Sequence, residues 1–320
     1  MSDTKYYRSL LNELERKVYD VYLEGLENQE SVITLPVFDP DSIQRILYAI
    51  NFDNPQLFYV DFSKGSLIHS REKCVINVNY YHTGEELEVI KQKIRKAASN
   101  IIRGIQGGTP EETALYLHDR LVRRCSYETL SERPQDAHNL IGPLLDYRCV
   151  CEGYAKAYKY LSDFVELPCI VVCGEGIHPD GSTAGHAWNL IRVKKNNYHV
   201  DVTFDLLIGQ KYCSRAYYGL STKEILYDHT IDPIFKIPDC PVSSPVLKKV
   251  SGTRELIQFL KEEVHHGKSF SEVRLSKSFT GETLMNMIEK RLTPEDLNWY
   301  RHLDAFWYKD AGKTVSVCWK

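Results

Sequence analysis

Residues 152–165 constrain the fold more than any other segment, because their apolar side chains recur at helical spacing on two faces of one predicted helix. A helix that is apolar on two faces has to be covered on both, so it lies inside a domain. Leu167 and Pro168 end the helix, and the apolar run 169–173 predicts a buried strand after it. We therefore expect the rest of the chain to be arranged around this helix.

A β-hairpin is predicted over residues 187–203, where two alternating segments flank four polar residues. With Val193 opposite Tyr198, the side chains of His186 and Asp201 share one face of the hairpin. In this register they are offset by four residues, so a bulge or a strong twist is needed to bring them into contact.

Cys151 stands immediately before the predicted helix, and this position favours a reactive thiol. The dipole and free N–H groups of a helix N-terminus lower the pKa of a thiol, and the same N–H groups can donate to an oxyanion. Gly153 leaves room for a substrate backbone to approach. The alternative for Cys151 is a buried, inert cysteine, and the helix start alone does not decide between the two.

Asp201 is the stronger anomaly, because a carboxylate within an apolar strand is costly to bury unless another group pairs with it. It can orient an imidazole, or it can pair with an arginine. His186 follows a glycine-bearing loop, where it can serve as a base or simply bond the backbone. Cysteine, histidine and aspartate in this order are typical of a nucleophile, its base and the group that orients the base.

Three motifs that carry these residues resemble the core motifs of the transglutaminase-like superfamily. They are Val150-Cys-Glu-Gly-Tyr-Ala-Lys-Ala-Tyr158, Gly185-His-Ala-Trp-Asn189 and Tyr198-His-Val-Asp-Val-Thr-Phe-Asp205. The resemblance covers residues 110–206, and more loosely the lead-in and residues 217–229, as in bacterial members of unknown substrate. Phe204 stands where many members have tryptophan, which leaves the three functional positions unaffected.

The resemblance implies that Cys151 is the nucleophile, His186 its base and Asp201 the orienting group. It also implies a papain-like α+β fold, in which a central cysteine-bearing helix packs on an antiparallel sheet that carries the histidine and the aspartate. Four further residues are candidates for the oxyanion site or the cleft: Glu152, Gly153, His138 and Trp188. For His138 and Trp188, an ordinary loop residue and a packing residue are the respective alternatives.

The domain organisation is predicted from changes in pattern along the chain. An α+β lead-in covers residues 1–82, the transglutaminase-like core covers 83–240, and a small α/β module covers 246–320. Prolines between 238 and 245 mark the linker before that module. Neither flanking part contains a catalytic motif.

Composition narrows the classes of function. The 320 residues carry a net charge of −3 with acids and bases mixed, which does not favour a nucleic-acid binder. The N-terminus has no apolar signal segment and no run is long enough to span a membrane, so we expect a cytoplasmic protein whose nine cysteines are reduced. Two widely separated CxxC pairs are absent, so neither a metal nor another cofactor is expected.

The sequence therefore predicts a cysteine enzyme that acts on amide bonds of a protein or peptide substrate through a thioester. Water as acceptor makes it a peptidase or deamidase, and an amine makes it a protein-glutamine acyltransferase. We favour hydrolysis, because constitutive cross-linking is unattractive inside a cell. The alternative is a non-catalytic module of the same fold that binds proteins or peptides.

Overall fold

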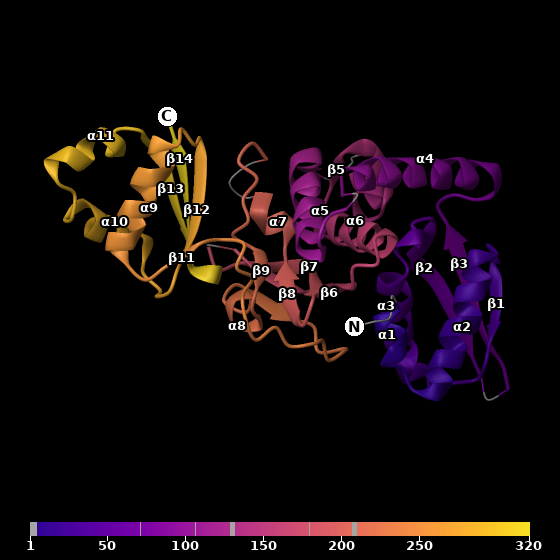
Figure 1. The fold of residues 1–320 in the computed structure, drawn as a ribbon. Coiled ribbons are helices and arrows are strands. Elements are labelled where there is room, and N and C mark those ends of the chain that lie inside the picture. The colour runs from indigo at the N-terminus through magenta and orange to yellow at the C-terminus, as the bar shows by residue number, and fades with distance from the viewer. Residues whose placement is uncertain (1–4, 71, 106, 129–131, 179, 207–209) are drawn as a thin grey trace.

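The computed structural model describes residues 5–70, 72–105, 107–128, 132–178, 180–206 and 210–320. The fold is α+β, as predicted, and its three parts follow one another across the molecule (Figure 1). The N-terminal part and the C-terminal module lie on opposite sides of the core. None of the helices in these ranges is long and apolar enough to cross a membrane.

Helix α6 (Cys151–Phe164) is the predicted central helix, and it is buried along most of its length. It packs on β6 and β7, which belong to an antiparallel five-stranded sheet with the order β10-β6-β7-β8-β9. The strands are β6 (Cys169–Ile177), β7 (Thr183–Val193), β8 (Asn196–Val200), β9 (Tyr218–Leu220) and β10 (His229–Ile231). A cysteine-bearing helix on an antiparallel sheet is the predicted core architecture.

Further elements around α6 complete the core. Helix α5 begins with a capping box, in which Thr109 and Glu112 satisfy each other's backbone N–H groups. The elements are α4 (Gly84–Ile102), η3 (Arg103–Ile105), α5 (Pro110–Arg124), β4 (Ser126–Tyr127), η4 (Pro134–His138), η5 (Gly142–Asp146), β5 (Arg148–Cys149), α7 (Val202–Asp205) and α8 (Thr222–Ile225).

The N-terminal part combines three helices with a sheet of the order β1-β3-β2. The two helices at the start of the chain are separate, because Asn12 caps the second one in a capping box with Glu15. The register of β2 against β3 shifts between Asp61 and Gly65. The elements are α1 (Tyr6–Ser9), α2 (Glu13–Glu27), β1 (Val32–Leu35), η1 (Pro40–Ser42), α3 (Ile43–Asp53), η2 (Pro55–Leu57), β2 (Val60–His69) and β3 (Cys74–Tyr80).

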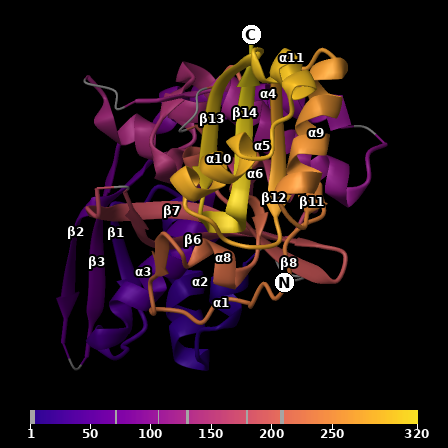
Figure 2. The same cartoon turned by 90° about the vertical axis from the view of Figure 1, so that its left-hand side faces the viewer.

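The C-terminal module is a four-stranded sheet with the order β11-β12-β14-β13, covered by helices α9 and α10 (Figure 2). Strand β13 lies in a segment that is rich in tryptophan and tyrosine. The elements are β11 (Lys249–Val250), α9 (Thr253–His265), β12 (Phe270–Leu275), α10 (Gly281–Glu289), η7 (Pro294–Asp296), α11 (Leu297–Tyr300), β13 (Leu303–Lys309), η8 (Ala311–Lys313) and β14 (Thr314–Trp319).

Apolar packing joins the first two predicted domains more closely than the third. Buried side chains from Tyr7 to Cys240 belong to one continuous core, which also takes in Ala311, whereas the C-terminal module has a core of its own. The hydroxyl of Tyr7 donates to the carbonyl of Val171 in β6 at 2.5 Å, so α1 is tied to the central sheet. The boundary near residue 82 therefore separates no independent hydrophobic core.

Buried polar contacts attach the C-terminal module to the central sheet. Arg274 of β12 is 3% exposed and donates to the carbonyl of Tyr218 in β9 at 2.6 Å. Glu272, on the same strand, accepts from the hydroxyl of Ser214 at 2.7 Å and from the backbone N–H of Arg215 at 2.7 Å. Because these groups are removed from water, they fix the module in one position on the core.

Gly174 allows strand β10 to lie against β6. A Cβ atom at this position would collide with the backbone carbonyl of Thr230 in β10, whereas a Cβ at Gly185 in β7 would meet nothing within 4 Å. Gly174→Ala should therefore lower the free energy of unfolding by about 2 kcal/mol. Gly185→Ala is the matched control and should change it by less than about 0.5 kcal/mol. Urea unfolding measures both, and equal stabilities would contradict this packing.

Candidate active site

Cys151 is the first residue of α6. Val150, the residue before it, is extended and places no side-chain cap on the helix N-terminus. Of the nine cysteines, Cys151 and Cys173 alone are partly exposed, and the other seven are buried. The thiol therefore combines access from solvent with the position that most favours its ionised form.

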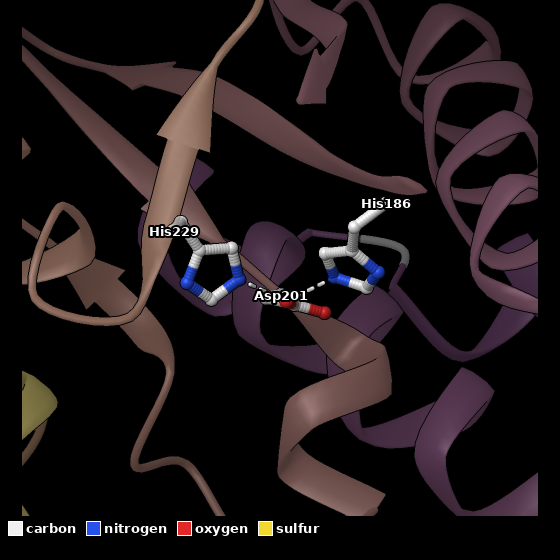
Figure 3. Close-up of side chains that lie close together, drawn as sticks. All are labelled: His186, Asp201 and His229. Atoms are coloured by element: carbon white, nitrogen blue, oxygen red, sulfur yellow. Dashed lines mark hydrogen bonds and ion pairs between the residues drawn. The ribbon is translucent and has the colours of Figure 1, made fainter. Parts of the chain in front are cut away.

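His186 lies on β7 and joins Cys151 to Asp201. Its Nε2 is 2.7 Å from Oδ2 of Asp201, and the second ring nitrogen points away from the carboxylate (Figure 3). Burial alone lowers the pKa of His186, but the charge of Asp201 and hydrogen bonds to Asp201 and to Cys151 outweigh it and raise the pKa to about 10. The imidazole is therefore charged at neutral pH.

Asp201 is completely buried where β8 meets the short helix α7. Its Oδ1 accepts the backbone N–H groups of Thr203 at 2.8 Å and Phe204 at 3.1 Å, so it is the N-cap of α7. Burial raises the pKa of this carboxyl, but the charge and hydrogen bond of His186 and the hydrogen bond of His229 hold it well below its usual range. Asp201 therefore stays ionised and fixes the orientation of His186.

The hairpin register explains how His186 and Asp201 meet. Strand β7 pairs with β8 through Val193 opposite Asn196, so the predicted register is wrong by two residues. Lys194 adopts a left-handed conformation with φ of 54° and tightens the turn. His186 and Asp201 still share a face, but their offset along the ladder falls from four residues to two, within reach of the side chains.

His229 is a site residue that the sequence analysis did not identify. Its Nε2 lies 3.0 Å from Oδ2 of Asp201, and its Nδ1 lies 2.7 Å from Oδ1 of Asp228. Carboxylates only accept, so both ring nitrogens carry hydrogen, and the two carboxylates raise the pKa of His229 against the opposing effect of burial. The hydroxyl of Tyr217 donates a hydrogen bond to Asp228 at 2.5 Å, so the series of hydrogen bonds continues from Asp201 through His229 and Asp228 to Tyr217. The only sequence signal was the histidine's place within the loosely matched segment 217–229.

Aromatic rings surround the imidazole of His186. Trp188 stacks on it with the centroids 5.9 Å apart and the planes at 16°, and Phe204 contacts it at 4.9 Å. Trp188 is 1% exposed and donates its indole N–H to Nδ1 of His199 at 3.0 Å. The structure therefore places Trp188 behind His186 as a packing residue, and not in a cleft.

Glu152 and His138 lie together beside the helix start but are directed away from the thiol. Nδ1 of His138 is 3.1 Å from Glu152, whose other oxygen is 2.8 Å from Nζ of Lys156. Burial opposes ionisation of Glu152, but Lys156 and His138 lower its pKa to about 2. These three side chains line a cavity of about 460 Å³ against the N-terminal part, and Cys151 is not among its lining residues.

The structure gives Gly153 a different role from the one predicted. It is buried, and a Cβ atom there would collide with the backbone carbonyl of Ala137 and crowd the side chain of Cys149. The backbone that lies close to this glycine is that of Ala137 in the protein itself, and not that of a substrate. Gly153 therefore positions the start of α6 on η4 and has no surface to offer a substrate.

His186, Asp201 and His229 are the one group among the described residues whose donor atoms lie close enough together to bind a metal ion. Both Nε2 atoms face a single carboxylate oxygen at 2.7 and 3.0 Å. Those distances are hydrogen-bond distances, and the remaining oxygen of Asp201 is occupied by backbone N–H groups. Hydrogen bonding alone accounts for this cluster.

Comparison with known proteins gives similarity at the level of structure only. No protein-family model and no curated protein matches the sequence. A crystal structure of a TGase is 12% identical with a TM-score of 0.32, covering 52% of this chain and 48% of that chain. A candidate cysteine protease from Cytophaga hutchinsonii is 12% identical with a TM-score of 0.29, covering 44% and 61%. A candidate protease from Parabacteroides distasonis is 8% identical with a TM-score of 0.31, covering 78% and 51%.

This chain spans about half to three fifths of the length of those proteins. Similarity at this level concerns the fold, and the roles of individual side chains are inferred from their own geometry.

The contacts of His229 generate a prediction about stability. His229→Ala leaves the buried Asp201 and the partly buried Asp228 without this donor, so the free energy of unfolding should fall by about 3 kcal/mol. His229→Gln keeps one N–H donor and should recover part of the loss. His138→Ala, a half-exposed control, should cost less than about 1 kcal/mol. Urea unfolding measures all three, and an unchanged stability of His229→Ala would refute the bridging role.

Proposed function

We propose that this protein is a cysteine enzyme that acts on amide bonds of proteins or peptides through Cys151, His186 and Asp201. The observation that carries the proposal is the position of His186. One ring nitrogen is held 2.7 Å from a buried carboxylate, and the imidazole also interacts with a partly exposed thiol at a helix N-terminus. Nucleophilic thiols are activated by this combination of a base and an orienting group.

Each residue has a distinct role in the proposed reaction. The Cys151 thiolate attacks the carbonyl carbon. The oxyanion that forms accepts hydrogen bonds from backbone N–H groups at the start of α6, which no side chain caps. His186 donates its proton to the leaving amine, which departs as a thioester forms with Cys151. The neutral imidazole then takes a proton from the acceptor, which attacks the thioester and releases Cys151 as the thiolate. Asp201 keeps the ring oriented throughout.

Activation of the thiol predicts selective alkylation. At pH 6, iodoacetamide should label Cys151 at least roughly tenfold faster than Cys173, the other partly exposed cysteine. Cys173 is a matched internal control, because burial raises its pKa to about 12 and keeps it protonated. His186 is charged throughout this range because its pKa is about 10, and a neighbouring positive charge favours the thiolate, so the Cys151 rate should fall less between pH 8 and pH 6 than that of a free thiol. A free thiol loses roughly a hundredfold over that range.

Peptide mapping by mass spectrometry measures the labelling, and His186→Ala should abolish the selectivity. Labelling of Cys151 no faster than that of Cys173, with the protein folded, would contradict the proposed chemistry. That outcome would favour the alternative, a non-catalytic module that binds proteins or peptides.

The acceptor decides between hydrolysis and transfer, and we favour water. The chain is predicted to act inside a cell, where constitutive cross-linking of proteins is unattractive. In water enriched in heavy oxygen, a mixture of glutamine-containing peptides should gain the label at newly formed carboxylates, through cleavage or deamidation. Cys151→Ser should gain none. With monodansylcadaverine present at millimolar concentration, predominant incorporation of the amine would instead show a transferase.

A further inference from the structure

A small cavity lies directly beside His186 and has no role in the steps above. Its volume is about 210 Å³. Drug-sized ligands and cofactors occupy sites of roughly 300–1,000 Å³, so this space suits one side chain. The lining residues are Tyr127, Gly176, His178, Ala184, Gly185, His186, Thr203, Phe204 and Leu206.

The cavity exists because two small residues face each other across the central sheet. Gly176 of β6 pairs directly with Ala184 of β7, and Ala184 is two residues before His186 on the same face of the strand. A Cβ at Gly176 would lie 3.0 Å from Cζ of Phe204 and 3.5 Å from Cγ of His186. A larger residue at either position of this pair would therefore crowd the space next to the imidazole.

The walls of the cavity are largely apolar. Phe204 and Leu206 come from the segment that follows Asp201, and Tyr127 is a half-exposed ring whose hydroxyl interacts with Cys151. None of the described residues that line the cavity is a carboxylate, lysine or arginine. An apolar group gains free energy by leaving water for such walls, whereas a charged group would find no opposite charge except an imidazolium.

We propose that this cavity is a specificity site that binds one uncharged, apolar side chain of the substrate next to the reacting thiol. The inference rests on the proposed function and adds a substrate class to it: peptides with an aromatic or large aliphatic residue beside the amide that is attacked. The bound side chain would contact the imidazole of His186 directly, and it would lie near the thiol through Tyr127, whose hydroxyl interacts with Cys151.

Two electrophiles of the same reactivity class test this proposal on the intact protein. Chloroacetamide and N-benzylchloroacetamide both alkylate a thiolate: the sulfur–carbon bond forms, the carbon–chlorine bond breaks and chloride leaves. The rate ratio of the two probes at Cys151 is divided by the same ratio for glutathione, which removes their intrinsic difference. We expect this corrected rate ratio to favour the benzyl probe by roughly tenfold or more, because its ring is buried in the cavity. Chloroacetylglycine, with a carboxylate in place of the ring, should gain much less.

Substitutions on β7 then locate the effect. Ala184→Leu projects into the cavity and should abolish the rate advantage of the benzyl probe over chloroacetamide. Thr183→Leu is the matched control, since Thr183 is the exposed neighbour on the opposite face of the strand and should keep the gain.

The possible failures are distinguishable. Rapid alkylation by chloroacetamide without a benzyl gain, or a gain that survives Ala184→Leu, would overturn the specificity site and leave the proposed chemistry intact. Reaction of Cys151 no faster than Cys173 with either probe would overturn the proposed function, and the specificity site with it.

Discussion

The buried carboxylate of Asp201 is the interaction on which the site depends. Removing a carboxylate from water is costly unless hydrogen bonds replace the lost hydration. Asp201 accepts from His186 of β7, from His229 of β10 and from two backbone N–H groups of α7. These donors come from three different elements, so compensation of one charge fixes the hairpin, the edge strand and the helix start relative to one another. The geometry of the imidazole facing Cys151 follows from that arrangement.

A second buried carboxylate lies at the other end of the same short helix. Asp205 is 2.9 Å from Nε2 of His118 in α5 and 3.0 Å from the hydroxyl of Ser214, which is itself 2.7 Å from Glu272 of the C-terminal module. A serine has a single hydrogen to donate, so one of the two carboxyls has to hold a proton. Burial raises the pKa of both Asp205 and Glu272, in agreement with that requirement. Helix α7 therefore connects the site on one side with the module on the other.

The fold class was predicted from the resemblance of the three motifs. Local pattern was enough to predict α6 and the shared face of His186 and Asp201, because helical and strand periodicity are properties of neighbouring residues. The same reasoning gave the wrong hairpin register, since nothing in the sequence marks Lys194 as a residue with positive φ. It also could not find His229, which reaches Asp201 only because β10 pairs with β6 across Gly174. Gly153 was misread for a similar reason: the carbonyl that requires a glycine belongs to Ala137, on another element.

Burying the charged side chains of His186, Asp201 and His229 together is costly in free energy, and this cost favours a catalytic role for them. Buried ion pairs are often no more stabilising than apolar residues of the same volume, so stability alone does not explain a histidine, an aspartate and a second histidine held together in the core. The cluster ends at the one partly exposed thiol that stands at a helix N-terminus, while Cys173 lies within a strand. The proposed binding module would not require an imidazole held between a buried carboxylate and a thiol. A thiol nucleophile does need it, since only the thiolate attacks and only a charged imidazole can hand a proton to the leaving amine.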